Sequence, residues 1–370
     1  MANPNAIVSR FVRPASQGAR GAAPEGPSFE LEGGRLVRLD PKNPRSDGFA
    51  RVLSGLAELR RPVYLELDPE TEAVSRLLIP HIGRVTKLRD VDAGLEVQID
   101  TSHGRHLLRR DRGDFAEIES VLRESKSGAM PIILTSNEAQ DLEDARPFRP
   151  GPDDGPIPEL LPKRQNYLRD LIDSIRWWPI WPWCWWWYRC VSTTRAQQIF
   201  DAMSATSCDP NAIAAPCIPF MFPDDGCWAR AHEMRRLMNT MGIEPKKIWI
   251  DGSLHTPTRN NPNCFVNWGW HVAPTICVRR RWRPWYIFWW WWGVRMVIDP
   301  SLFTTPVTKA DWKAVQGDPN ATLTETAGSD YWFGQTDPAY VDTNYWLTYY
   351  RLELQNRVNQ SGPPPYANCP

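Results

Sequence analysis

The residue best suited to nucleophilic chemistry is Cys227. After it, apolar side chains recur at the spacing of one helix face, at Ala231, Met234, Leu237, Met238 and Met241. Asp224 and Asp225 precede this segment as N-cap candidates, and Gly242 follows it in the C′ position. The pattern predicts a helix with Cys227 in its first turn. There, unpaired N–H groups and the macrodipole lower a thiol pKa and favour the nucleophilic thiolate.

A histidine and a carboxylate follow on two predicted strands. Residues 263–278 alternate and are rich in aromatic and β-branched side chains, which predicts a strand carrying His271. Pro274 lacks an N–H and favours an edge position or a bulge. A second strand is predicted in residues 293–303, and Asp299 ends it at an Asp-Pro pair. Two strands joined in this way can be hairpin neighbours. Cys227, His271 and Asp299 then form a triad in the α+β arrangement of papain-like and transglutaminase-like cysteine hydrolases.

Other residues near these three have less specific interpretations. Trp228, Trp268 and Trp270 flank the cysteine and the histidine, so they are candidates for lining a substrate cleft and excluding water. Packing in the core explains Trp228 equally well. His232 and Glu233 lie beyond the first turn of the predicted helix, and we interpret them as structural or surface residues.

Several motifs, in order, closely resemble the bacterial protein-glutaminase family. They are CIPF at 217–220, DDGCWARAHEMR at 224–235, WGWHVA at 268–273, IDPSLF at 298–303, PV at 306–307 with Trp312, and the tail YVDTNYWL at 340–347. The resemblance covers roughly residues 190–350. It implies that protein-bound glutamine is deamidated to glutamate, with release of ammonia through a thioester.

The resemblance also assigns roles. It implies Cys227 as nucleophile, His271 as general base and acid, and Asp299 as the group that orients His271. The implied partner is a protein or peptide with an exposed glutamine. The chemistry requires no metal or organic cofactor. Cys227 and His271 could bind a metal, but two ligands without a closing pair argue against a metal site.

Three features depart from the family. Known members are made with a signal peptide and an inhibitory pro-region, and no such signal is visible here. The connection between His271 and Asp299 is longer and filled with tryptophan, so that its hairpin tip could lie near the cleft. Pro274 replaces an ordinary strand residue.

Composition divides the chain into four segments. Residues 1–27 read as a disordered leader, 28–145 as a small α+β domain, 146–164 as a Pro/Gly-rich linker and 165–370 as the catalytic domain. In the first domain we expect helices over 46–61, capped by Ser46, and over 115–125. We also expect strands over 62–68 and 130–136 and a hairpin around 92–94. This domain could regulate or target the enzyme, or block its cleft.

Two tryptophan-rich segments, 176–190 and 279–293, stand out among the 20 tryptophans. They could pack against each other or against the first domain. They could instead contact a membrane, a partner or a carbohydrate, with Arg279, Arg280, Arg281 and Arg283 favouring anionic headgroups. Both are too short or too interrupted by proline to span a bilayer.

The charge and cysteine content bear on the partners and the cellular compartment that we expect. Lys+Arg and Asp+Glu each number 43, so no basic excess indicates nucleic acid. Without a Sec-type signal, we expect a cytoplasmic protein or one exported by a non-classical route. In an exported protein Cys208, Cys217 and Cys264 could form disulfides, and Cys184 could pair with Cys190; reduced core cysteines are the alternative. His103 and His106 could be metal ligands or part of a solvated loop.

Rival functions use the same residues differently. A transglutaminase would replace water by an amine, and a cysteine protease would cleave the main chain. A different class of protein, a membrane- or carbohydrate-binding interaction protein, would leave the triad idle.

Overall fold

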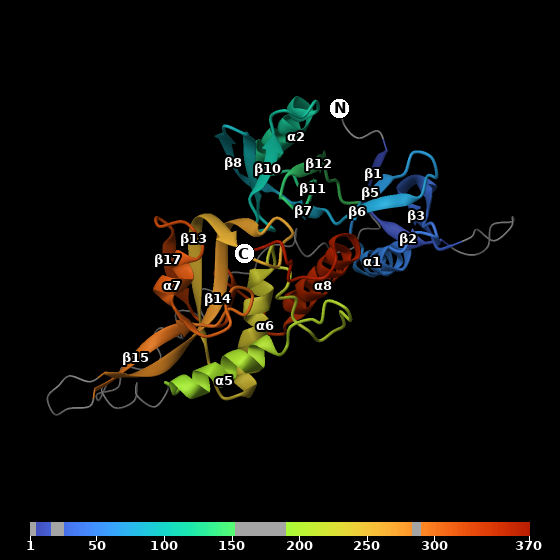
Figure 1. Ribbon diagram of the computed structural model, residues 1–370. Coiled ribbons are helices and arrows are strands. Elements are labelled where there is room, and N and C mark those ends of the chain that lie inside the picture. Colours follow the sequence, from blue (N-terminus) through green and yellow to red (C-terminus); the bar gives the residue numbers. More distant parts are fainter. Residues whose placement is uncertain (1–4, 16–25, 152–189, 283–289) are drawn as a thin grey trace.

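The computed structural model describes residues 5–15, 26–151, 190–282 and 290–370 (Figure 1). They form a mixed α/β structure in three parts: an N-terminal lobe (residues 6–78), a middle lobe (81–148) and a C-terminal part (190–370). The first tryptophan-rich segment lies outside the described residues except for Cys190. The side chains of 280–292 in the second segment are also outside them. The predictions made for these clusters stay predictions.

The C-terminal part is built on an antiparallel sheet with strand order β16-β15-β14-β13-β17. Its strands are β13 (Lys246–Pro257), β14 (Phe265–Trp282), β15 (Trp290–Val297), β16 (Val307–Thr308) and β17 (Thr322–Thr326). The two predicted strands are confirmed as β14 and β15, which pair from Thr275–Val297 to Trp282–Trp290. The described part of this hairpin leads away from the helices that flank the sheet (Figure 1).

Helices cover this sheet. They are α5 (Thr193–Ser204), α6 (Cys227–Thr240), the short α7 (Lys309–Ala314) and α8 (Val341–Ser361), with a small hairpin of β18 (Asp330–Trp332) and β19 (Gln335–Thr336). Helix α6 packs between β14 and α8. The predicted helix after Cys227 is therefore confirmed, and Gly242 ends it with a left-handed φ of 75°.

The N-terminal lobe contains two three-stranded sheets and one helix. They are β1 (Ala6–Ser9), β5 (Val63–Leu67) and β6 (Val74–Leu78); β2 (Val12–Pro14), β3 (Ser28–Leu31) and β4 (Leu36–Arg38); the 3-10 turn η1 (Glu32–Gly34); and α1 (Ser46–Leu59). Strands β1 and β2 lie in the expected disordered leader. That expectation is wrong for residues 6–14, because pairing with β5 and β3 satisfies their backbone groups. The N-cap of α1 is Arg45, so the prediction that Ser46 caps this helix is wrong.

The N-terminal lobe shares its hydrophobic core with the C-terminal part. Residues of α1 such as Phe49 and Val52 belong to the same buried cluster as Tyr349 and Leu354 of α8. The helices approach closely because α1 presents glycine: a Cβ at Gly55 would lie 2.5 Å from the side chain of Leu352. The region 28–145 therefore does not have one core of its own.

The middle lobe has a separate small core. Its elements are β7 (His81–Gly83), β11 (Ile132–Ser136) and β12 (Leu142–Pro147); β8 (Val85–Val91), β9 (Gly94–Ile99) and β10 (His106–Arg109); and α2 (Phe115–Gly128). The hairpin, helix and strand expected here are confirmed. The loop between β9 and β10, residues 100–105, reaches the C-terminal part and bridges to β14 at Gly104 and Trp268.

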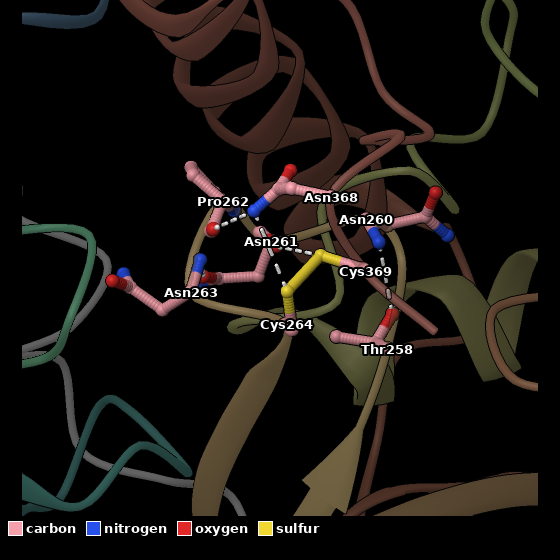
Figure 2. Close-up of a disulfide and its surroundings, with 8 residues drawn as sticks. All are labelled: Thr258, Asn260, Asn261, Pro262, Asn263, Cys264, Asn368 and Cys369. Carbon is pink, nitrogen blue, oxygen red and sulfur yellow. Dashed lines mark hydrogen bonds between the residues drawn. A yellow bond between two sulfur atoms is a disulfide. The ribbon is translucent and has the colours of Figure 1, made fainter.

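Three disulfides join described segments: Cys190–Cys277, Cys208–Cys217 and Cys264–Cys369. The pairing of Cys184 with Cys190 is therefore wrong. Figure 2 shows how Cys264–Cys369 fastens the C-terminus to the loop before β14, where Asn368 Nδ2 also donates to Pro262 O. Among the described cysteines only Cys227 is free. No helix of the described residues is long and apolar enough to cross a lipid bilayer.

Loop length should rank the disulfides. The Cys264→Ala/Cys369→Ala variant opens a sequence separation of 105 residues and should lose roughly 5 kcal/mol of unfolding free energy by chain entropy. The matched Cys208→Ala/Cys217→Ala variant opens a separation of 9 and should lose roughly 3 kcal/mol. Chemical denaturation of both proteins measures the difference. Equal losses would contradict the ranking.

Candidate active site

Cys227 is the first residue of α6. Gly226 before it turns the chain in the left-handed region, with φ 79°. No larger residue fits there, because a Cβ would lie 2.3 Å from the Tyr350 ring. Cys227 therefore lies in the first turn of the helix, as predicted.

The two aspartates before α6 do not cap it. The N-cap is Gly226, and no side chain bonds to the first turn. Asp225 Oδ1 instead accepts from the Gly226 N–H at 2.8 Å. Asp224 pairs with Arg357 at 2.5 Å. The capping expectation is wrong because these carboxylates hold the segment before the helix.

His271 and Asp299 are joined by a short hydrogen bond. His271 Nε2 lies 2.9 Å from Asp299 Oδ2, and both side chains are almost completely buried. Asp299 also accepts from Trp312 Nε1 at 2.9 Å and from Ser301 Oγ at 2.5 Å. These donors fix the carboxylate, which in turn orients the imidazole. Trp312 belonged to the quoted motifs, but the sequence did not indicate that it would be a donor to Asp299.

The environment of this pair sets its ionisation. Burial alone would raise the pKa of Asp299, but His271 and the hydrogen bonds from His271, Ser301 and Trp312 outweigh it and hold the pKa below its ordinary value. Burial lowers the pKa of His271, against the opposing effect of Asp299. The pair is therefore a neutral imidazole against a carboxylate. Nδ1 of His271 makes no hydrogen bond with the described residues.

Pro274 lies on the central strand β14, between β13 and β15, so the expected edge position is wrong. It is placed where the β14–β15 ladder ends. Thr275 makes the last pair, with Val297, and Pro274 O accepts from Ile298 N at 2.9 Å. Proline has no N–H to return the reciprocal bond to Ile298 O, so the ladder ends at this pair.

The sulfur of Cys227 is covered by a residue of the middle lobe. His103 Nδ1 lies 2.9 Å from Cys227 Sγ. His103 is completely buried, and its backbone N–H lies 3.3 Å from Asp225 Oδ1. The sequence singled out His103 only as a possible metal ligand or loop residue. A Ser-His-Gly turn predicts a loop but does not reveal what the loop touches.

Backbone hydrogen bonds hold the 100–105 loop against β14. The Gly269 N–H donates to His103 O at 2.8 Å, and the Arg105 N–H donates to Asn267 O at 3.0 Å. Gln140 of the middle lobe strengthens the contact, since its amide both donates to Asn267 O and accepts from the Asn267 N–H. The loop thus adds to the strand as an extended peptide would.

The three candidate cleft tryptophans surround His103. Its ring stacks on Trp268 at 5.2 Å between centroids and meets Trp270 edge-on at 5.2 Å and Trp228 at 6.0 Å. Trp228 is also packed against Trp332 at 4.5 Å. The His103 ring therefore packs among these tryptophans next to Cys227. Their role in substrate binding stays a prediction.

The low thiol pKa expected from the helix start is wrong for this arrangement. Burial raises the pKa of Cys227 well above its ordinary value, and Asp225 adds to the rise, while the nearby Arg230 cation only partly opposes it. The helix terminus stabilises a thiolate by at most about 2 kcal/mol. Complete burial can raise the thiol pKa by several units, and each unit corresponds to about 1.4 kcal/mol. The covered cysteine is a neutral thiol.

His232 and Glu233 are buried structural residues, as interpreted from the sequence. His232 Nε2 lies 3.1 Å from Asp337 O and its Nδ1 lies 3.1 Å from Lys247 Nζ. Glu233 pairs with Arg236 at 2.6 Å. His232 ties α6 to β13 and to the segment before α8, and neither residue is hydrogen-bonded to the sulfur of Cys227 within the described part of the chain.

One group of potential metal ligands occurs among the described residues. His103, Cys227 and His271 each offer a donor atom, and these atoms all lie within 4.8 Å of one another. The sequence analysis grouped only Cys227 and His271, and the third ligand, His103, comes from the middle lobe.

Residues 196–316 match the family model described as Glutaminase. All three residues of the predicted triad lie within this segment. This segment is similar to the glutaminase family. The resemblance predicted from the motifs is thereby confirmed for the segment.

Solved structures add similarity at lower identity. A crystal structure of pro-protein-glutaminase is 20% identical over 79% of this chain and 99% of that chain, with a TM-score of 0.48. A crystal structure of protein-glutaminase is 28% identical over 44% of this chain and 89% of that chain, with a TM-score of 0.37. The NMR structure of protein-glutaminase from Chryseobacterium proteolyticum is 28% identical over 42% and 84%, with a TM-score of 0.35. No curated protein matches the chain.

Removing the His103 ring should expose the sulfur of Cys227. The His103→Ala variant should react with iodoacetamide at Cys227 at least about 10-fold faster than the parent, since opening a closed state that is ~90% populated gives that factor. Peptide mass spectrometry measures the rate. His106→Ala is the matched control, because His106 is buried beside the same loop but does not bond to Cys227. Equal rates in the parent and His103→Ala would show that the ring does not shield the sulfur.

Proposed function

We propose that the chain is an amidohydrolase that deamidates glutamine side chains in proteins, and that the 100–105 loop holds it in a latent form. The observation that carries the proposal is the placement of Cys227 at a helix start, beside a histidine that a buried carboxylate orients, within a segment similar to the glutaminase family. The similarity to glutaminases, and to structures described as protein-glutaminase, supports protein-bound glutamine as the substrate class.

The chemistry begins when the cleft opens and the thiol passes its proton to His271 Nδ1. Nε2 stays with Asp299, so the imidazolium is stabilised as it forms. The Cys227 thiolate then attacks Cδ of the glutamine side chain. The Cys227 backbone N–H, directed from the start of α6, is the candidate donor to the oxyanion. Asp299 keeps its carboxylate charge throughout.

Three proton transfers through His271 complete the cycle. His271 gives its proton to the departing amide nitrogen, which leaves as ammonia, and a γ-glutamyl thioester remains on Cys227. His271 then takes a proton from water, whose oxygen attacks the thioester carbonyl. The C–S bond breaks, the sulfur of Cys227 regains its proton from His271, and a glutamate side chain is released. No step requires a metal or an organic cofactor.

Latency follows from what surrounds the sulfur. With His103 against it, the thiol is shut off from solvent and its ionised form is disfavoured. A glutamine side chain would need the space among Trp228, Trp268 and Trp270 that the His103 ring occupies. Displacing the loop would therefore both free this space and rehydrate the sulfur.

The rival acyl-transfer enzymes differ in the acceptor or the bond cleaved. Ammonia release without amine incorporation and without new peptide fragments separates deamidation from transglutaminase and protease activity. Liposome or glycan binding with no ammonia release would favour the interaction protein with an idle triad.

The triad can be tested by ammonia release from a denatured protein substrate. Cys227→Ala and His271→Ala should abolish release, because each removes a group that forms or breaks bonds. Asp299→Asn should lower the rate by roughly 10³–10⁴-fold and leave measurable activity, because it disturbs only the orientation and charge of His271. Circular dichroism checks that the variants fold. Full activity in folded Cys227→Ala would contradict the proposal.

Latency can be tested by separating the lobes from the C-terminal part. A specific protease site inserted between Arg164 and Gln165 allows the purified full chain to be cut. Because α1 and α8 share a core, activity should follow the fraction of fragments that separate in size-exclusion chromatography. The separated C-terminal fragment should be at least about 10-fold more active than the uncut chain. A folded fragment no more active than the uncut chain would exclude restraint by the lobes.

A further inference from the structure

Three side chains that can bind a soft or borderline metal ion meet at the contact between the middle lobe and the C-terminal part. His103 comes from the 100–105 loop, Cys227 from the start of α6 and His271 from β14. Their donor atoms lie within 4.8 Å of one another, and all three residues are at most 1% exposed. The ligand set is complete only while the loop is docked.

The two histidines are positioned in different ways. His271 Nε2 lies 2.9 Å from Asp299 Oδ2, and its Nδ1 has no hydrogen-bond partner among the described residues. A carboxylate–histidine pair of this kind orients an imidazole ligand and raises its basicity at zinc sites. His103 Nδ1 lies 2.9 Å from the sulfur, and the loop backbone holds His103 in place through the bond from the Gly269 N–H to His103 O. Each imidazole therefore has a nitrogen within reach of the same thiol.

We propose that the docked chain binds one zinc-like divalent cation through Cys227 Sγ and one ring nitrogen each of His103 and His271. Cys227 would bind as the thiolate, with its proton released to solvent. A water completes the tetrahedron, as in zinc sites with three protein ligands. Zinc is favoured over magnesium or calcium because the donors are sulfur and imidazole nitrogen rather than oxygen.

The distances and charges suit this ion. In a tetrahedral zinc site the donor atoms lie about 3.5 Å apart, so small rotations of the two imidazoles would close the present cluster around a metal. Two carboxylates, Asp225 and Asp299, act on the sulfur together with the Arg230 cation, and Lys247 also interacts with it. The carboxylates and the thiolate would offset the charge of a divalent cation, which reduces the cost of burying it.

The ion would reinforce the closed state. It binds ligands on both sides of the contact, so it stabilises the docked loop by mass action and occupies the sulfur directly. The regulatory consequence rests on the proposed function, whereas metal binding itself does not. The ion inhibits in this scheme and takes no part in the deamidation.

Cobalt(II) is added to the purified full chain in which Cys227 is kept as the reduced thiol. This tests the site without an activity assay. We expect one equivalent to bind, with a thiolate-to-cobalt charge-transfer band in the near ultraviolet and intense tetrahedral d–d bands in the visible. Zinc should displace cobalt, abolish the bands and raise the unfolding temperature. Cys227→Ala should lose the charge-transfer band.

The decisive comparison is between two histidines of the same lobe. His103→Gln should weaken cobalt affinity by at least about 10–100-fold, the loss typical even of groups that only support a ligand. The matched control His106→Gln should bind cobalt like the parent. Circular dichroism confirms that both variants fold, and a failure of the triad variants in the ammonia assay would not affect these spectra.

Two results would overturn the proposal. One is the absence of a charge-transfer band in the folded parent chain at saturating cobalt. The other is equal cobalt affinity in folded parent and His103→Gln chains, which would mean that the middle lobe supplies no ligand. If His103→Gln does not fold, alkylation of the parent chain replaces it as the test. Zinc should slow alkylation of Cys227, and an unchanged rate would overturn the proposal.

Discussion

The contact of His103 with the sulfur of Cys227 is the interaction on which the state of the site depends. It places an imidazole from the middle lobe among tryptophans of the C-terminal part. Water is excluded from the sulfur, and the ionised thiol loses the solvent that would stabilise it. The His271–Asp299 pair of the proposed triad is in place, but burial disfavours the thiolate that the proposed attack needs.

Two electrostatic effects compete at Cys227, and their sizes decide the result. The start of α6 favours a thiolate, as does the nearby Arg230. The helix terminus contributes at most about 2 kcal/mol and Arg230 opposes burial only in part, whereas complete burial can shift a pKa by several units. Burial therefore prevails while the loop is docked. When the sulfur regains water, the helix terminus and His271 can act as they do in other cysteine enzymes.

The stability of the closed arrangement has a broad base. Beyond the loop itself, α1 and α8 bury one continuous core, and close packing at Gly55 brings their backbones together. The Cys264–Cys369 disulfide ties the C-terminus to the segment before β14 (Figure 2). In that segment Asn261 donates to Asp224, next to the residues that contact the loop. Restraint of the nucleophile is thus linked to the core of the whole chain, and release must disrupt more than one hydrogen bond.

The sequence by itself determined the local structure around the site. Helical periodicity after Cys227, alternation around His271 and the Asp-Pro pair at Asp299 predicted α6, β14 and the end of β15, because such patterns depend on neighbours within a few residues. Tertiary structure alone decided that His103 covers the sulfur, that Trp312 donates to Asp299 and that β1 and β2 are strands. These contacts join residues separated by 13 to more than 100 positions. The pKa of Cys227 belongs to the same class: its sign depends on how much water reaches the sulfur, and a spacing pattern carries no information about burial by a distant loop.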